Sequence, residues 1–479
     1  MRNIKSLLLT SVCVLSLTAC VSSRDYTGAP TISGAADTKI EALGNQRFQD
    51  VEIISKWWES LQDQQLNKLI DMSLDNNKDI GVARLNLEEA RSIARETGFD
   101  RYPTVTANGA YKRSRSSGEL GLGESQVTNN FNAGFDANWE LDLFGRVSER
   151  VKGSQARKDI AEASLRHVYV TISSEVARTY VELRGAQHRL NIATRNTKNQ
   201  ADTYRLTKKL VEGGRGTNLD VARAKTQLEL TRSTIPTLDA EVTGTINRLS
   251  VLSGQVPDAL RSDLVKMMPL PSIPEVVNVG NVSDLLRRRP DIIAAEYALV
   301  ATVADYNVAV SDQFPVVNIV GVLGFAATTF SSFGASAVAA SVGPSVNWSA
   351  FDMGRVYARI DQSDARAHAA VATYEKTVLY ALEELQTSVS NFSKEEERRG
   401  YLQRAARSGR EAATLARKRY EAGVDTFIEV LDAEATLLQA EDTLAQSEIS
   451  TALDLIAIYK ALGGGWQGVV DDTSKAVSR

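Results

Sequence analysis

Few residues in this sequence are of the types and spacings that carry out covalent or metal chemistry. The histidines are His167, His188 and His368, and all lie in stretches with helical periodicity, with no cysteine to share a metal ion. The Gly463-Gly464-Gly465 run follows a helical stretch rather than opening one, so it is not a phosphate-binding loop. We also find no serine, histidine and aspartate arranged as a catalytic triad. The sequence therefore predicts no enzyme, no cofactor and no metal site.

Cys20 is the residue whose surroundings predict a chemical modification. A basic start is followed by an apolar run over 7–17, which is too short to span a bilayer as a helix but typical of a signal peptide. It ends in Leu17-Thr18-Ala19-Cys20, which resembles a bacterial lipobox, in which the cysteine thiol takes a diacylglycerol. Val21 replaces the aspartate that retains Gram-negative lipoproteins at the inner membrane. We expect residues 1–19 to be removed and lipid attached to Cys20.

Composition narrows the class of protein further. The chain has 479 residues and a formal net charge of −4, without the basic excess of a nucleic-acid-binding protein. No run of eighteen apolar residues follows the signal peptide, so a membrane crossing would use β-strands. Cys13 leaves with the signal peptide, which makes an internal disulfide impossible in the mature chain.

The sequence contains an internal duplication. Tyr102-Pro103-Thr104-Val105 returns as Phe314-Pro315-Val316-Val317, a shift of 212 residues. Gly145-Arg146-Val147 returns as Gly354-Arg355-Val356, a shift of 209 that then holds for about 80 residues. The change of three residues falls where a hairpin loop would absorb it at little cost. Each half therefore predicts a helix (62–97 and 283–311), two strands, a very long helix, a short turn and a returning helix.

Four segments have the period-two pattern of strands: 103–114, 129–141, 315–328 and 338–351. Segments of this length suit a tilted bilayer crossing, and Trp139 and Trp348, at equivalent ends, suit an interfacial aromatic girdle. The edge of a soluble sheet is the alternative on pattern alone. Four strands cannot close a barrel, and an open edge is not stable in lipid. Several copies must therefore share one barrel, with a strand number that is a multiple of four.

The segment 148–212 contains no proline, and its apolar residues are spaced close to a heptad repeat. At 1.5 Å per residue, a helix of about 65 residues is about 100 Å long, too long for a compact domain. The expected seam residues are Leu165, Val168, Ile172, Val176, Tyr180 and Leu183, and in the second copy Val371, Tyr374, Val378, Ala381, Leu385, Val389 and Phe392.

Short glycine-containing turns end both long helices. Gly214 and Gly423 suit a left-handed helix C-cap. Thr217 and Thr426 suit the N-cap of the returning helix, and an acid follows each at the third position, Asp220 and Glu429. These caps predict two helical hairpins with equivalent tips.

Five longer motifs occur along the chain. They are Leu285-Leu286-Arg287-Arg288-Arg289-Pro290-Asp291-Ile292, Gln313-Phe314-Pro315, Tyr420-Glu421-Ala422-Gly423, Val430-Leu431-Asp432-Ala433 and Lys460-Ala461-Leu462-Gly463-Gly464-Gly465-Trp466. Together they resemble the TolC family of outer-membrane factors, and in particular its NodT- and OprM-like efflux lipoproteins. The resemblance covers nearly all of the mature chain.

The resemblance implies a mainly α fold with a membrane β part, in which a homotrimer forms a 12-strand β-barrel and a 12-helix periplasmic α-barrel. It implies a passive exit duct in the outer membrane for small molecules or drugs. The implied partners are a periplasmic adaptor protein and an inner-membrane pump of the resistance-nodulation-division (RND) class, in contact with outer-membrane lipid.

By the same resemblance, the periplasmic end is closed by acidic rings and helix-turn contacts. The matching acids are Glu429 and Asp432, and Asp220 and Tyr420 match residues that link neighbouring helices in the closed state. Three copies of two carboxylates around a narrow aperture would repel one another and attract cations. Ordinary first-turn helix acids are the plain alternative. Asp425 stands where one family member has a gating arginine, which puts an arginine latch in doubt. The hairpin tips with Gly214, Thr217, Gly423 and Thr426 are the expected adaptor contacts.

These inferences divide the chain into consecutive regions. They are a signal peptide (1–19), a lipid-anchored extension (20–60), a first repeat (61–256), a linker that its prolines mark as non-helical (257–280), a second repeat (281–466) and a tail (467–479). The first repeat holds a β-hairpin (103–141) and long helices (148–253), and the second holds a β-hairpin (315–351) and long helices (357–462).

Two other functions remain open at this point. The same channel could serve a type I protein-secretion system, although the lipobox and the Lys460 to Trp466 motif favour efflux. A lipid-anchored periplasmic coiled-coil structural protein is the alternative from a different class. It predicts no barrel and no conductance, and the paired alternating strands argue against it.

Overall fold

The structure is a computed structural model that describes residues 24–28, 30, 47–49, 55–115, 127–279 and 287–467. Cys20, the expected signal peptide and most of the tail lie outside the described residues. The chain divides into two compact units. Unit 1 comprises Met1–Pro30, Asn86–Glu162 and Ala294–Lys376, and unit 2 comprises Thr31–Leu85, Ala163–Ile293 and Thr377–Arg479.

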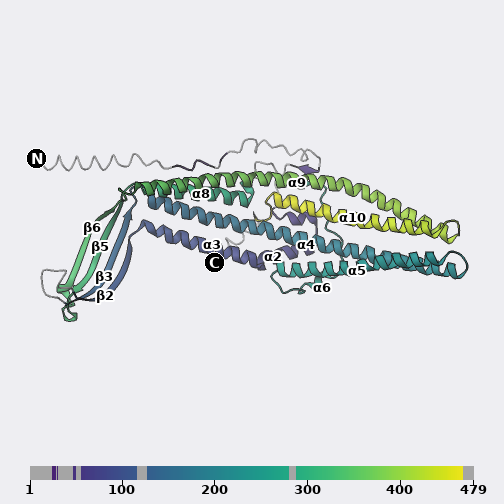
Figure 1. The fold of residues 1–479 in the computed structure, drawn as a ribbon, viewed down its shortest axis with the longest axis horizontal. Coiled ribbons are helices and arrows are strands. Elements are labelled where there is room, and N and C mark those ends of the chain that lie inside the picture. The colour runs from purple at the N-terminus through teal and green to yellow at the C-terminus, as the bar shows by residue number, and fades with distance from the viewer. Residues whose placement is uncertain are drawn as a thin grey trace. The chain divides into compact units, whose positions relative to one another are not determined.

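The elements follow the duplicated order that the sequence predicts (Figure 1). The α-helices are α2 (Gln64–Asn76), α3 (Lys78–Gly98), α4 (Arg146–Glu212), α5 (Asn218–Leu252), α6 (Arg261–Leu264), α8 (Pro290–Ser311), α9 (Met353–Glu421) and α10 (Phe427–Ala461). The strands are β1 (Phe48–Gln49), β2 (Thr104–Arg115), β3 (Val127–Leu141), β4 (Val277–Asn278), β5 (Val316–Ala327) and β6 (Val338–Asn347). Short 3-10 turns are η3 (Trp57–Leu61), η4 (Phe99–Arg101), η5 (Phe330–Ser332) and η6 (Ala335–Ala337).

Unit 1 holds an antiparallel sheet with the strand order β2-β3-β5-β6 (Figure 1). Thr104 pairs with Asn138 in the first hairpin, and Val316 pairs with Asn347 in the second. The shifts of 212 and 209 residues convert the first pair into the second, so both hairpins have the same register. The duplication seen in the sequence is therefore also a duplication of backbone pairing.

The register sorts the side chains of this sheet into two faces, because residues opposite each other project to the same side. One face is apolar and exposed, with Val342 and Val346 having 80% and 64% of their surface accessible. The other face carries polar pairs such as Asn108 and Asp136, which are hydrogen-bonded. An apolar face this exposed in a single chain marks a surface that another phase or another molecule covers.

Several boundaries differ from those expected. Helix α8 begins at Pro290 instead of 283, and α9 begins at Met353 instead of 357. The helix expected over 62–97 is two helices, because Asn77 adopts an extended conformation (ψ 135°) and its side chain accepts hydrogen bonds from the amides of Asp79 and Ile80. The last strand ends at Asn347 instead of 351. The linker expected to be non-helical contains one helical turn, α6.

In unit 2 the long helices pair as two hairpins, α4 with α5 and α9 with α10. The expected seam residues are largely buried, including Val176, Tyr180 and Leu183 on α4 and Leu385 and Phe392 on α9. This confirms the periodicity as a packing face. The remaining faces stay charged, which suits helices with water along one side.

The centre of unit 2 is an aromatic and polar core. The ring of Trp57 stacks on Tyr459 at 4.9 Å and meets Trp58 edge-on at 5.7 Å. Arg184 is fully buried, donates to Gln65, Gln187 and the carbonyl of Lys266, and lies over the ring of Tyr180. A buried guanidinium with this many acceptors fixes the approach of α2 and the linker to α4.

Helix α8 is long and apolar enough to cross a membrane, judged only by length and composition. Its buried Asn307 exchanges two hydrogen bonds with the backbone of Arg24 and donates to Glu149. Its Glu296 accepts from Tyr26. These polar contacts to other protein segments identify α8 as a packed helix.

Candidate functional site: the helical hairpin tips and the strand–helix junction

The two hairpin tips end their long helices in the same way. Gly214 and Gly423 have φ angles of +78° and +77°, which confirms the expected left-handed C-caps. The amide of Arg215 donates to the carbonyl of Leu210, and that of Val424 donates to Arg419, at 2.7 and 2.9 Å. These are the bonds of a Schellman motif, which satisfies the last free carbonyls of a helix.

The returning helices begin differently at the two tips. The Thr217 hydroxyl accepts from the Asp220 amide, and the Asp220 carboxylate accepts from the Thr217 amide at 2.9 Å, a complete capping box. Thr426 occupies the equivalent N-cap position without a side-chain hydrogen bond. The predicted hydroxyl cap is therefore confirmed at Thr217 and wrong at Thr426.

Asp425 closes the second tip with Arg419. The guanidinium donates two hydrogen bonds to the carboxylate, at 2.5 and 2.8 Å, and this contact lowers the pKa of Asp425 below its ordinary value. The second tip therefore carries the Asp425 carboxylate, which is paired with Arg419, six residues earlier in the chain. At the first tip, the guanidinium of Arg215 lies against Gly423, where any Cβ would collide with it.

Tyr420 belongs to a small apolar cluster where the two hairpins meet near their tips. Ala224, Tyr420, Phe427 and Val430 form it, and Leu210 is among the partly buried residues packed against it. The Tyr420 hydroxyl is buried and has no hydrogen-bond partner among the described residues. Burying a hydroxyl without a partner costs free energy, so this contact holds the tips together less tightly than a bonded one would.

Glu429 and Asp432 lie on the side of α10 that is opposite to the apolar cluster. Glu429 and Asp432 are both exposed, whereas Val430 between them is fully buried. In the chain as described, the carboxylates remain available to solvent. The structure thus places Tyr420 where the two hairpins meet, keeps Asp220 in the capping box of its own tip, and leaves Glu429 and Asp432 on an exposed face.

Glu434 and Glu441 of α10, with their arginine partners, form a charged ladder farther from the turns than the apolar cluster. It was not predicted from the sequence. Glu441 of α10 is 6% exposed and accepts from Arg410 of α9 at 2.6 Å and from Arg195 of α4 at 2.9 Å. Seven residues earlier, Glu434 accepts from Arg417 at 2.6 Å and from Thr203 at 2.9 Å. The shared spacing of seven residues is the pattern that would have indicated it.

The Arg289 motif is a second structural centre, which the sequence showed only as a family motif. Arg289 donates to Asp291, to Glu384 of α9 and to the carbonyl of Ala461 at the end of α10. Burial acts against the charge of Asp291, but the hydrogen bonds of Arg289 outweigh it and lower the pKa of this carboxyl. One guanidinium thus fastens three segments of unit 2.

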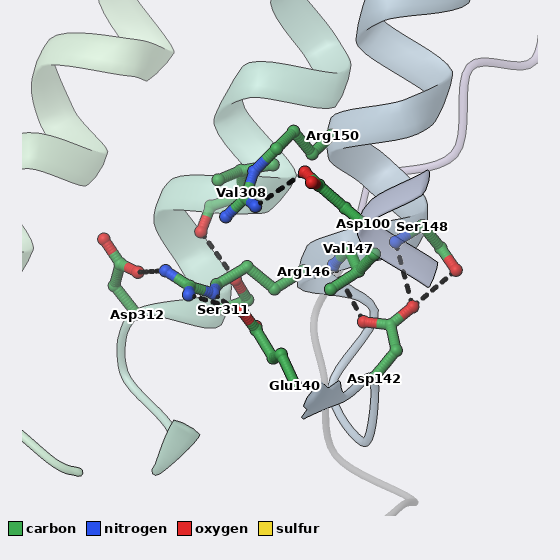
Figure 2. A network of polar contacts seen from close by, with 10 residues as sticks. All are labelled: Asp100, Glu140, Asp142, Arg146, Val147, Ser148, Arg150, Val308, Ser311 and Asp312. Atoms are coloured by element: carbon green, nitrogen blue, oxygen red, sulfur yellow. Dashed lines mark hydrogen bonds and ion pairs between the residues drawn. The ribbon is translucent and has the colours of Figure 1, made fainter. Parts of the chain in front are cut away.

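Charged side chains also fill the junction between strands and helices in unit 1 (Figure 2). Arg146 donates two bonds of 2.8 Å to Glu140 and lies 3.6 Å from Asp312. Asp142 caps α4 by accepting from the amides of Val147 and Ser148. The indole N–H of Trp139 donates to the Arg101 carbonyl, and that of Trp348 donates to Gln313, both at 3.0 Å.

This architecture matches a known family. The family described as outer membrane efflux protein matches residues 69–255 and 281–464, one stretch in each repeat. The chain belongs to the outer membrane efflux protein family. It is a component of an outer-membrane efflux channel, and it resides in the outer membrane and extends into the periplasm, as its sequence predicted.

Individual relatives align along nearly the whole chain. The cation efflux system protein CusC of Escherichia coli O6:H1 is 30% identical over 459 residues, with 95% of this chain and 97% of the relative covered. The toluene efflux pump outer membrane protein TtgC of Pseudomonas putida is 30% identical over 468 residues, with 96% of each covered. The solved structure of the outer-membrane channel OprN is 39% identical and covers 94% of this chain and 100% of its own, with a TM-score of 0.87.

Proposed function

We propose that this chain forms a homotrimeric, passive exit duct for small molecules within a tripartite efflux system. Lipid on Cys20 would anchor it, the hairpin tips would contact a periplasmic adaptor, and an inner-membrane pump of the RND class would supply the energy. The open sheet edges carry this proposal most directly. Strands β2 and β6 end the four-stranded sheet, and an unpaired edge beside an apolar face is not stable in lipid.

Three copies would supply twelve strands, enough to close a barrel. The relatives are named for cation and toluene efflux, which favours small molecules over secreted proteins as cargo. A type I secretion role remains the second candidate. Sensitivity of a deletion strain to a panel of drugs, metals and solvents would separate the two, because loss of protein secretion without sensitisation would favour the second.

We further propose that the hairpin tips form the gate. Tyr420 lies in the contact between the two hairpins, and Asp220 holds the helix cap of the first tip. In a ring, Glu429 and Asp432 of each copy would surround one aperture. Six carboxylates there would attract cations and repel each other when they approach. Closure then depends on the tip contacts outweighing this repulsion.

Single-channel conductance in planar bilayers tests the gate. We expect Asp220→Ala and Tyr420→Ala to raise the conductance, whereas Asp202→Ala, which removes an exposed acid elsewhere on α4, leaves it unchanged. Thr217→Ala breaks the same capping box as Asp220→Ala, so it shows how much of the effect comes from the helix end alone. Wild-type conductance in both gate variants would contradict the gate.

A further inference from the structure

The two repeats of one chain meet at a seam that has three kinds of contact, all in unit 1. Strand β3 of the first repeat pairs with β5 of the second, with Ala133 opposite Phe325. Beside it, Arg146 reaches Asp312 at 3.6 Å. The rings of Phe144 and Phe314 stack with centroids 4.7 Å apart and planes 12° apart.

The repeat shifts assign an equivalent to every residue of this seam. Arg146 corresponds to Arg355 and Phe144 to Met353, by 209 residues. Asp312 corresponds to Asp100 and Phe314 to Tyr102, by 212 residues. The structure supports this assignment locally, because the contacts inside each repeat obey it. Arg150 pairs with Asp100 at 3.1 Å, and their equivalents Arg359 and Asp312 lie 4.0 Å apart.

The seam equivalents do not meet each other within the described chain, and they are more exposed. The Arg355 side chain is 69% exposed and pairs only with Asp352, three residues before it, whereas that of Arg146 is 27% exposed. Tyr102 is 64% exposed. The edge strands β2 and β6 likewise have no neighbour on their outer sides among the described residues.

We propose that these residues form the seam between two copies of this chain, with Arg355 of one copy paired with Asp100 of the next. Met353 then packs on Tyr102 of the next copy, and β6 pairs with its β2 so that Val342 lies opposite Arg113. This proposal rests on the ring assembly proposed above and specifies its interface. The internal seam is the template, so the duplicated chain continues the same pattern from copy to copy.

The two faces of the sheet exclude the neighbouring registers. In the proposed register, Val342 and Val346 share their face with Arg113 and Gly109, which lie on the apolar side of β2 with Tyr111. A slip by one residue would place Ser341 and Ser345 on that side, opposite the existing pattern. Opposite charge at the junction adds a second, independent constraint, since Arg355 and Asp100 stand at the same end of their strands as Arg146 and Asp312.

Cysteine pairs in the full-length membrane protein test the register, and the lipid on Cys20 would leave no native free thiol. We expect oxidation to link subunits in either Val342→Cys with Arg113→Cys or Ser341→Cys with Ser114→Cys. One of these adjacent pairs is of the close, non-hydrogen-bonded type. The control pair, Val342→Cys with Gly109→Cys, is displaced by four residues, about 13 Å, and should stay unlinked. Equal linkage in the control, or linkage in neither test pair, would overturn the proposed register.

Charge reversal tests the ion pair in the same oligomer. We expect Arg355→Asp and Asp100→Arg each to lower the temperature at which the oligomer dissociates in detergent, and the double variant to recover much of the loss. Asp352→Asn removes only the intrachain partner of Arg355 and should have little effect. If the double variant loses as much dissociation temperature as the two single variants added together, the ion pair is refuted. If the ion pair is refuted but the conductance stays at the wild-type value, the proposed channel stands and only the proposed interface fails. If the protein forms no oligomer at all, both the channel and the interface are overturned.

Discussion

At the residue scale, the two tips show how identical positions acquire different strengths. Thr217 and Thr426 are equivalent by the repeat shift, but only Thr217 completes a capping box. The second tip is held instead by Arg419 and Asp425, which bridge the turn itself. The two hairpins therefore have different local stabilities at ends with the same backbone path.

The caps give a direct prediction. We expect Thr217→Ala to destabilise the first turn of α5 by about 1 kcal/mol, because an amide of that helix end loses its acceptor. Thr426→Ala, the matched control, should cost less than about 0.5 kcal/mol, since no side-chain bond is lost. Hydrogen exchange of peptides that cover each tip would measure both. Equal acceleration at the two tips would contradict the difference.

Asp454 gives a prediction about pH. Burial, and then the nearby charge of Glu395, raise its pKa from 3.8 to about 6. Glu395 itself accepts hydrogen bonds from Arg398 and Ser447. Because the folded-state pKa is raised, ionisation of Asp454 costs stability as the pH rises from about 4 to about 6. At neutral pH the cost is about 1–2 kcal/mol, allowing for partial exposure.

We therefore expect Asp454→Asn to raise the melting temperature at pH 7.5 and to have no effect near pH 4. Asp442→Asn on the same helix is the control, because it removes an acceptor of Arg189 and should not stabilise the protein. A stabilisation by Asp454→Asn that is the same at both pH values would show that the charge of Asp454 is not the cause.

At the scale of elements, the charged ladder connects one helical hairpin with the other. Glu434 and Glu441 are bound by arginines of their own hairpin and by residues of α4 in the other. A hairpin that moves away from α4 must break these cross-bonds. The ladder thus sets how much free energy a movement of the tips requires.

We expect Glu441→Gln to destabilise the packing of α4 on α10 by about 1–3 kcal/mol, since two guanidinium groups lose a charged acceptor. Burial acts against the charge, but Arg410 and Arg195 outweigh it and lower the pKa of Glu441 below 4.5. The loss should therefore be full at neutral pH and decrease only as the pH falls through the lowered pKa of Glu441, where the wild-type carboxyl becomes protonated.

Thermal unfolding of both proteins between pH 3.5 and 8 would measure this difference. Glu229→Gln removes an exposed pair with Arg232 on α5 and should change the melting temperature little. If the charged ladder does not stabilise the protein, Glu441→Gln and Glu229→Gln should have the same melting temperature.

At the scale of the whole molecule, two glycines allow the close approach of the strands that join the repeats. Gly134 and Gly324 lie opposite each other in β3 and β5, and a Cβ at Gly134 would lie 2.7 Å from the Cα of Gly324. Backbone lies on both sides of this contact, so no side chain can move aside. The seam between the hairpins therefore depends on glycine at this point.

We expect Gly134→Val to separate β3 from β5 and to strongly reduce the amount of heat-resistant oligomer in the outer membrane. Gly321→Ala is the control in the same pair of strands, because its Cβ would be 3.7 Å from the Ala137 Cβ, an ordinary contact. Normal assembly of Gly134→Val would show that the seam tolerates the wider spacing.

Local sequence patterns predicted much of the secondary structure and of the helix ends. Apolar periodicity located the strand faces and the helix seam, and the need for a positive φ angle located the C-caps at Gly214 and Gly423. The repeat shifts identified the duplication, and they also match the registers of both hairpins. The break at Asn77 and the unbonded Thr426 were missed, because one side-chain hydrogen bond decides each.

Tertiary structure alone decided which residues become partners over long distances. It joined the hairpins through β3 and β5, which leaves β2 and β6 as the open edges. It placed Asp312 beside Arg146, Ala461 beside Arg289, and both Arg195 and Arg410 on Glu441. Sequence periodicity reports only which side of an element is apolar. The partner of a charged side chain depends on how separate elements pack, and only the fold determines that.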